Sequence, residues 1–228
     1  MKRPNTDNAR SSSYSAELLS RRWLTDRAFE IELARPESFT FEPGQRIRII
    51  HLDIERDYSL ITTPTDSTIA LCVHHVQGGH LSPLLVSAKI GAEISFTGPY
   101  GYFTYRSSTR PSIWVATGTG VAPFLSMARS GVTGFTLLHG VRTSEDLYYE
   151  QVFRAAARRY IPCLSGEHNL LRSGEDGFHG RVTDYLMEHL PVATYDFYLC
   201  GRQEMTRDVA LLVDEKFPGS LVYMETFY

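Results

Sequence analysis

The sequence predicts an antiparallel β-barrel domain followed by an α/β domain with a doubly wound parallel sheet. Two observations favour this fold class. Over residues 14–106, short segments of alternating apolar and polar residues recur at the spacing of a barrel. Over residues 111–228, apolar strands alternate with amphipathic helices, which is typical of a parallel sheet covered on both faces. The polar stretch YRSSTRPS is the expected linker, and residues 1–13 are expected to form a flexible lead-in.

The elements of the first domain follow from period-two alternation and turn residues. Strands are expected within YSAELLSRRWL, AFEIELARP, FEPGQRIRIIHL and TIALCVHHV. The next stretch, HLSPLLVSAKIGAEISFTGPYG, predicts a short helix, a turn and a strand that ends in glycine and proline.

The elements of the second domain alternate between the two periods. Strands are expected within SIWVATGTG, GFTLLHGV and YDFYLCG. Helices are expected within VAPFLSMARSG, SEDLYYEQVFRAAARRY, RVTDYLMEHL and QEMTRDVALLVDEKF. The second of these helices, residues 144–160, is predicted as one continuous amphipathic helix.

Composition narrows the class of function. The 228 residues carry a net charge of −3, which does not favour a nucleic-acid partner. No run approaches the roughly 20 apolar residues that cross a bilayer, and the opening MKRPNTDNARSSSYS lacks the apolar core of a secretory signal. The cysteines, Cys72, Cys163 and Cys200, are too few and too widely spaced for a metal site or an iron–sulfur cluster. A reducing cytoplasm is the expected location.

Three stretches carry candidate chemistry, and each also has an ordinary structural interpretation. A strand that runs into Gly118 and Gly120 and opens a helix can bind a phosphate, or can be a plain strand-to-helix turn. RDYSL and GGHLS can supply a cation and free amides that bind a second phosphate. They can equally be an exposed arginine on a strand and a glycine turn capped by Ser82. Cys200 ends a strand at the ligand-binding edge of an open sheet, or is a buried small hydrophobe.

The order of the motifs is more specific than any one of them. FEPGQ, RDYS, GGHLS, GPYG, GTGVAP, HGVRTSEDLYY, YLCG and a terminal aromatic residue follow one another along the chain. In this order, over residues 14–228, the sequence resembles the ferredoxin–NADP reductase family of two-domain flavoproteins. The resemblance implies a reductase that uses FAD and NADP(H) or NAD(H).

The resemblance also implies an FAD site. Arg56 would pair with the pyrophosphate, Tyr58 would lie along the isoalloxazine and ribityl, and Ser59 would lie near flavin N5. The pyrophosphate site would be completed by Gly79, His80, Leu81 and Ser82. Phe227 is expected to cover the flavin ring and Tyr228 the adenine, and together they would form a gate for the nicotinamide.

For the nicotinamide nucleotide, the resemblance implies a pyrophosphate turn made by Thr117, Gly118, Thr119 and Gly120. Cys200 would lie near the nicotinamide and Glu225 near the reacting rings. Hydride would pass directly from nicotinamide to flavin N5, so Ser59, Cys200 and Glu225 would act by aligning rings and tuning charge.

The choice between NADP and NAD stays open in the sequence. Gly166 stands where many NADP-using members carry an arginine. Arg142 could meet a 2′-phosphate or could be a solvated cation, and Arg172 or Arg181 could assist.

The expected electron partner is a ferredoxin or flavodoxin on a separate chain. Alternatives are a reductase component of an oxygenase system, a reductase of free flavin, or a flavin-binding module without turnover. The arginines of the predicted helix 144–160, Arg154, Arg158 and Arg159, could form a docking face or a solvated helix face. His74 and His75 are expected to be one inward and one outward strand residue without a metal role.

Overall fold

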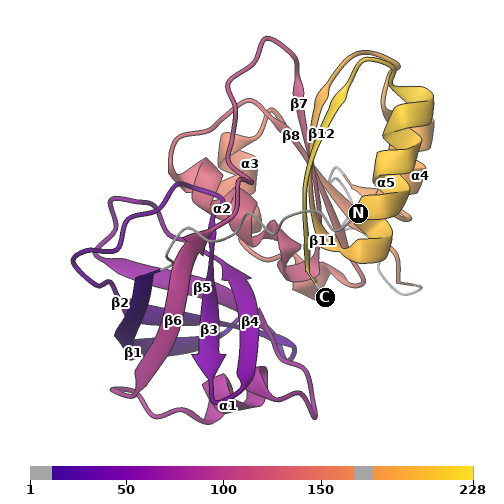
Figure 1. Cartoon of the computed structure of the whole chain (residues 1–228). Helices are drawn as coiled ribbons and strands as arrows, with labels where there is room; N and C mark the ends of the chain where they lie inside the picture. Colours follow the sequence, from indigo (N-terminus) through magenta and orange to yellow (C-terminus); the bar gives the residue numbers. More distant parts are fainter. Residues whose placement is uncertain (1–11, 167–176, 228) are drawn as a thin grey trace, which may run out of the picture.

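The computed structural model describes residues 12–166 and 177–227, and in this part of the chain the strands form two six-stranded sheets (Figure 1). The first sheet is antiparallel and the second is parallel. The predicted fold class is therefore confirmed.

The first sheet curls toward a closed barrel. Its strands are β1 (Ser12–Trp23), β2 (Ala28–Ala34), β3 (Arg46–His51), β4 (Ile54–Ser59), β5 (Thr68–His74) and β6 (Glu93–Tyr100), and α1 (Leu81–Ser87) follows β5. Their order is β4-β3-β6-β1-β2-β5. The two edge strands meet just beyond β4, where Leu60 bridges to Leu71 and the amide of Ile61 donates to the carbonyl of Ala70 at 3.0 Å. From Phe29 onward every second residue of β2 is fully buried, which matches the predicted alternation.

The second sheet has the order β10-β9-β8-β7-β11-β12. Its strands are β7 (Ser112–Thr117), β8 (Thr136–Val141), β9 (Arg159–Leu164), β10 (Phe178–His179), β11 (Asp196–Arg202) and β12 (Leu221–Phe227). The connecting helices are α2 (Ala122–Arg129), α3 (Glu150–Ala156), α4 (Val182–His189) and α5 (Gln203–Lys216), with short 3₁₀ turns at Gly118–Val121 and Ser144–Asp146.

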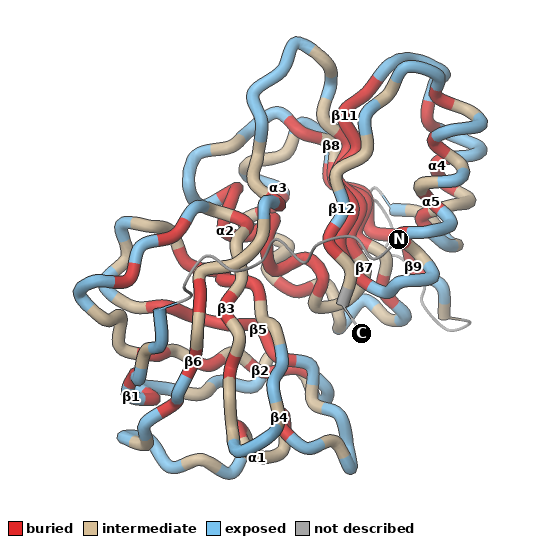
Figure 2. Tube along the Cα trace, in the orientation of Figure 1, coloured by how far each residue is buried: buried red, intermediate tan, exposed pale blue. Residues whose placement is uncertain are grey.

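Helices cover both faces of the parallel sheet, with α2 and α3 on the side of the barrel and α4 and α5 on the other (Figure 1). Successive residues of β7 alternate between the two resulting cores: Trp114 packs with Phe124 of α2, whereas Val115 packs in the cluster under α4 and α5. Because both faces of the strand are buried, it reads as an unbroken apolar run. Figure 2 shows buried residues along the central strands and along α2.

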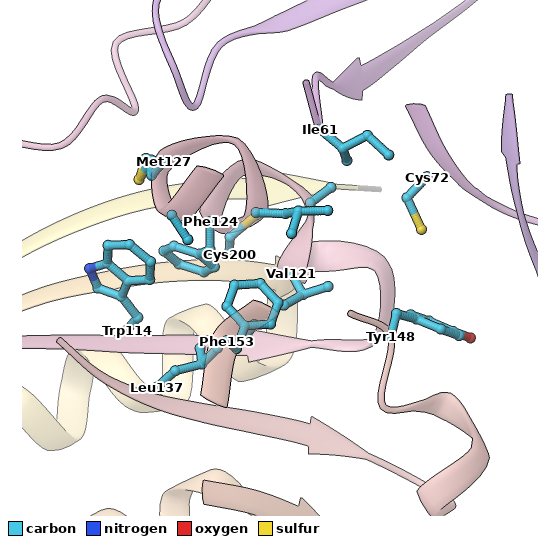
Figure 3. Packing of buried hydrophobic residues seen from close by; sticks show 14 of the residues in the cluster. Ile61, Cys72, Trp114, Val121, Phe124, Met127, Leu137, Tyr148, Phe153 and Cys200 are labelled. Atoms are coloured by element: carbon cyan, nitrogen blue, oxygen red, sulfur yellow. The ribbon is translucent and has the colours of Figure 1, made fainter. Parts of the chain in front are cut away.

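The barrel and the parallel sheet share a hydrophobic core through α2. Ile61 and Cys72 of the barrel belong to the same buried cluster as Val121, Phe124 and Cys200 (Figure 3).

Polar contacts also cross this junction. Ser126 Oγ donates to the Thr62 carbonyl at 2.6 Å, and Arg129 Nη1 donates to the Ile61 carbonyl at 3.1 Å. The two units therefore meet through a packed interface in which Ser126 and Arg129 are both hydrogen-bonded.

The prediction of one helix over residues 144–160 was wrong. The segment forms a 3₁₀ turn, then the seven-residue α3, and its last two residues begin β9. Tyr149 interrupts it with a positive φ of 59°, while its hydroxyl donates to Glu30 of the barrel at 3.0 Å. This contact between the two units outweighs the local helical pattern.

The three arginines therefore do not share one helix face, which corrects the basis of both alternatives, the docking face and the solvated helix face. Arg154 lies in α3, where it pairs with Glu150 at 2.8 Å, and Arg158 follows the helix. Arg159 lies in β9 and donates to the hydroxyl of Tyr185 at 3.1 Å.

The two expected strand histidines lie at the end of β5: His74 is its last residue and His75 follows it. His74 is exposed, and His75 is half-buried with its ring edge-on to Trp23. His75 also lies edge-on to the buried Phe29, whereas His74 lines the cleft described below.

The expected linker is fastened to β11. The Arg106 amide donates to the hydroxyl of Tyr198 at 3.0 Å, and Arg110 pairs with Asp196 at 3.3 Å. The backbone of the tail forms β12, a parallel edge strand beside β11. The side chain of Phe227 and the whole of Tyr228 lie outside the described part of the structure.

Candidate functional site

A cleft of about 2110 Å³ lies where the carboxyl ends of the parallel strands face β3, β4 and the loop before α1. This is the edge at which open α/β sheets bind ligands. The predicted site residues that line it are Arg56, Tyr58, Ser59, Gly79, His80, Leu81, Ser82, Thr117, Gly118, Thr119, Gly120, Arg142 and Glu225. Residues from distant parts of the sequence are thus brought to one cavity.

Strand β4 supplies the barrel side of the cleft. Arg56 and Tyr58 alternate along it with Asp57 and Ser59, so the two pairs point to opposite sides of the strand. Burial raises the pKa of Tyr58 to about 12, against the opposing charge of Arg56, so the phenol remains a neutral hydrogen-bond donor and acceptor. Ser59 is buried, and its Oγ has no well-formed hydrogen bond within the described part of the chain.

The loop before α1 is already partly hydrogen-bonded to itself. The Gly79 amide donates to the Val76 carbonyl, and Ser82 Oγ accepts from the Val76 amide, both at 3.0 Å. The predicted use of the Gly79 amide as a free phosphate donor therefore competes with this turn.

The turn after β7 is packed against the end of β11. A Cβ on Gly120 would come within 2.6 Å of the Cys200 carbonyl oxygen and of Gly201 Cα, so only glycine fits there. Thr117 Oγ1 accepts a hydrogen bond from the Arg202 amide at 3.2 Å. These contacts fix the backbone amides of the turn at the start of α2, where negative charge is favoured.

The residues considered for nucleotide choice lie at the far side of this turn. Arg142 follows β8, and its carbonyl accepts the Gly166 amide at 3.0 Å. Gly166 and Arg181 also line the cleft, whereas Arg172 lies outside the described residues.

Cys200 and Glu225 are paired by strand register. Cys200 in β11 lies beside Glu225 in β12 on one side and Ala116 in β7 on the other. The Cys200 side chain is fully buried in the core shared by the two units and does not line the cleft (Figure 3). Glu225 lines the cleft with 8% of its surface exposed.

Two arginines of β3 belong to this site although sequence reasoning missed them. Arg46 pairs through Nη1 with Glu225 and through Nε with Asp57 at 3.0 Å. Arg48 holds Asp57 with two hydrogen bonds, at 2.7 and 3.1 Å. The alternation in QRIRI, set against RDYS on a neighbouring strand, was the available signal, because charges opposite one another on a sheet pair.

Burial and pairing oppose one another at the two carboxylates. Burial raises the pKa of Glu225, and the Arg46 charge only partly offsets this rise. At Asp57 burial acts in the same direction, but the hydrogen bonds from Arg48 and Arg46 outweigh it and lower the pKa. Of these two carboxylates, Glu225 is therefore the one whose charged form depends more on pairing with Arg46.

A buried histidine lies beneath the nucleotide turn. His139 in β8 is fully buried, and its Nδ1 lies 3.0 Å from the Tyr160 hydroxyl. Burial lowers its pKa to about 4, against a smaller opposing effect of the Gly118 backbone, so the ring is neutral at pH 7. It was not among the predicted site residues.

Over residues 12–166 and 177–227, no group of three or more His, Cys, Asp or Glu side chains is placed to hold a metal ion. Over the same residues, no helix has the length and apolar character to cross a membrane.

Two family models match the two halves of the chain. An oxidoreductase FAD-binding domain covers residues 20–105, and an oxidoreductase NAD-binding domain covers residues 114–210. Together with the cleft between the sheets, they define a two-domain oxidoreductase that binds FAD and a nicotinamide nucleotide.

Several characterised proteins are similar to this chain. Ferredoxin–NADP reductase B of Sorangium cellulosum is 33% identical over 196 residues, which is 78% of this chain and 77% of that protein. The ferredoxin–NAD(P)⁺ reductase component of the naphthalene 1,2-dioxygenase/salicylate 5-hydroxylase systems of a Ralstonia species is 33% identical over 216 residues, or 89% of this chain. This chain covers only 64% of the Ralstonia protein and 62% of a toluate 1,2-dioxygenase electron transfer component from Pseudomonas putida, so it spans less than two thirds of those relatives.

The fold is also that of solved reductases. A ferredoxin–NADP⁺ reductase from Neisseria gonorrhoeae with bound FAD and NADP superposes with a TM-score of 0.81 at 20% identity, covering 95% of this chain and 99% of that one. The chain belongs to the ferredoxin–NADP reductase family.

Proposed function

We propose that this chain exchanges hydride between NAD(P)H and FAD and passes single electrons to a ferredoxin or flavodoxin. The observation that carries the proposal is the cleft, which gathers the residues expected for both dinucleotides at the junction of the two sheets. In this proposal residues 14–106 are the FAD-binding domain and residues 111–228 the nucleotide-binding domain.

The residues at the barrel side of the cleft fit FAD. Arg56 offers an exposed cation whose Nη1 donates to the carbonyl of the neighbouring Glu55 at 2.7 Å. Tyr58 offers a flat, largely buried ring, and Ser59 Oγ is a buried polar atom in need of a partner. A dinucleotide needs a cation for its phosphates, an aromatic surface and a polar group beside its ring. The proposal also places Phe227 and Tyr228 over the flavin, because β12 leads its last residues past Glu225 at the cleft.

The nucleotide would lie across the turn from Thr117 to Gly120, with its 2′ side toward Arg142 and Arg181. When bound, FAD supplies the chemistry of taking up a hydride and releasing its electrons one at a time. The chain contributes alignment: the glycine turn fixes one dinucleotide, β4 fixes the other, and Ser59 and Glu225 mark the place between them. Cys200 would act through packing behind Gly120, since its side chain does not reach the cleft.

A second candidate is a reductase component of an oxygenase system. It is favoured by the similarity to components of naphthalene and toluate dioxygenase systems and of propane 2-monooxygenase. In either case the electron acceptor is proposed to lie outside residues 1–228, because their three cysteines are buried and cannot supply four thiolates. A reducing cytoplasm is the proposed location, supported by these free thiols.

The experiment is to purify the protein, record its flavin absorbance, and compare NADPH with NADH in steady-state reduction of ferricyanide. We expect bound FAD and turnover with at least one nucleotide. Turnover is then measured with a ferredoxin, a flavodoxin and free FMN as acceptors, which separates the electron-carrier role from reduction of free flavin. A colourless protein that does not take up added FAD would overturn the proposal.

A further inference from the structure

The Arg46–Glu225 contact joins the two sheets at the cleft. Arg46 lies in β3 and Glu225 in β12, 179 residues further along the chain. Glu225 is nine-tenths buried, and Arg46 keeps 26% of its side chain exposed. Both residues line the cleft. The pair therefore belongs to the ligand-binding surface as well as to the interface between the units.

The surroundings of the pair are built to accommodate it. Gly101 has a φ of +94°, and a Cβ there would come within 2.6 Å of Arg46 Nη1 and 3.2 Å of Glu225 Oε1. The absent side chain leaves room for the guanidinium, and the other edge of that group is held by Asp57. Arg46 thus has carboxylates on two sides and is fixed in one orientation.

A contact with Ser59 also favours the charged form of Glu225, but it falls short of a complete hydrogen bond. Glu225 Oε2 and Ser59 Oγ are both buried, and neither makes a well-formed hydrogen bond within the described residues. Ser59 lies opposite Arg46 in the β3–β4 ladder. Two unsatisfied polar atoms at the meeting point of the two proposed ligands mark a place for a hydrogen-bonding group of a ligand.

We propose that Arg46 is a positioning residue that keeps the Glu225 carboxylate charged and holds it at the junction of the two ligand sites. This inference rests on the proposed function of the cleft. The charged and titratable groups around Glu225 are Arg46 from β3, Asp57 from β4 and Cys200 from β11. Of these, Arg46 alone favours the charged carboxylate, because Asp57 repels it and Cys200 is a buried neutral thiol.

The charge of Glu225 can be measured directly. The protein is labelled with ¹³C at its glutamate carboxyl carbons, and E225Q identifies the Glu225 resonance. Its titration midpoint is recorded in wild type, R46Q, R46K and R110Q. Arg110 provides the matched control because it also pairs with a buried carboxylate, that of Asp196, but lies outside the cleft lining.

We expect R46Q to raise the Glu225 midpoint by at least one pH unit, a tenfold change in proton affinity. R46K should raise it less, because an ammonium keeps the charge but cannot hold two carboxylates as a guanidinium does. R110Q should leave it unchanged. The proposal is overturned if Glu225 titrates at the same midpoint in R46Q as in wild type. If R46Q does not fold, the same result in R46K overturns it.

The positioning role has its own test. The rate at which NADPH or NADH bleaches the flavin absorbance is measured in single turnovers from pH 5 to pH 9. The acid limb of the profile should move upward in R46Q together with the carboxyl midpoint, and should be absent in E225Q. A profile that stays in place while the midpoint moves refutes the positioning role. If neither nucleotide reduces the flavin of wild type or of any variant at any pH, the proposed function fails. The carboxyl titration then still decides whether Arg46 controls the charge of Glu225.

Discussion

Replacing Gly120 with alanine tests whether the nucleotide turn depends on close packing against β11. The new Cβ would lie 2.6 Å from the Cys200 carbonyl oxygen and from Gly201 Cα. These are backbone atoms of a strand held on both sides, by β7 and by β12, so they cannot rotate away. The turn must move out to the 3.4 Å at which ordinary contact begins, a shift of about 0.8 Å (3.4 − 2.6).

Overpacking of this kind costs about 1–3 kcal/mol. For a chain of this size that free energy lowers the midpoint of thermal unfolding by about 2–12 °C. The same shift moves the amides of the turn away from the nucleotide phosphates, so the dissociation constant for NADPH or NADH should rise. Retention of FAD should not change, because the FAD residues lie on the other side of the cleft.

The assay combines thermal unfolding with nucleotide titration followed by difference absorbance. G131A is the matched control, since Gly131 has a φ of +98°, no atom within 4 Å of its Cβ position, and no place in the cleft. It should lose stability through backbone strain and keep nucleotide affinity. If G120A matches wild type in both stability and nucleotide affinity, the packing argument is wrong.

Two further predictions concern Tyr149 and His139. Y149F removes the hydroxyl that donates to Glu30 across the two units, and a hydrogen bond to a charged acceptor contributes about 1.5–3 kcal/mol. Urea unfolding should show a loss of that size in Y149F. The control Y102F changes a residue that is 89% exposed and should show no loss. For His139, the folded pKa of about 4 lies below the unfolded value of 6.5, so the stability that comes from the neutral ring is present above pH 6.5 and is lost as pH falls toward 4. The difference of 2.5 pH units (6.5 − 4) corresponds to about 3 kcal/mol. On acidification, the free energy of unfolding of H139Q, measured with urea, should therefore fall by about 3 kcal/mol less than that of wild type. An equal fall in the two proteins would contradict the prediction.

The parts of the fold that were predictable from the sequence are those whose signal is local. The sequence predicted β7 and the helix after it because the apolar run of the strand is followed directly by the glycines of the turn, Gly118 and Gly120. The alternation in β2 was readable because one face of that strand is buried and the other is not. The order of the motifs then pointed to the family.

The remaining features depend on contacts between distant residues. Helical periodicity over 144–160 was real, but Tyr149 reaches Glu30, 119 residues away, and takes a conformation that ends the pattern. The carboxylates of strand β4, Glu55 and Asp57, pair across the ladder with Arg46 and Arg48, which no local pattern records. The contact of Arg46 with Glu225 required knowing that β12 lies beside β11.

Strand β12 is the last strand of the second sheet, so the site is complete only when the whole molecule has folded. The pairs of Asp57 with Arg46 and Arg48 lie within the barrel itself. Glu225 reaches them only after β11 has joined β7 and β12 has joined β11, and the loop closed in this way is 179 residues long. Because contacts of such separation form late, the flavin side of the cleft should become organised before the nicotinamide side, and proteolysis that releases β12 should leave a folded barrel with an incomplete site.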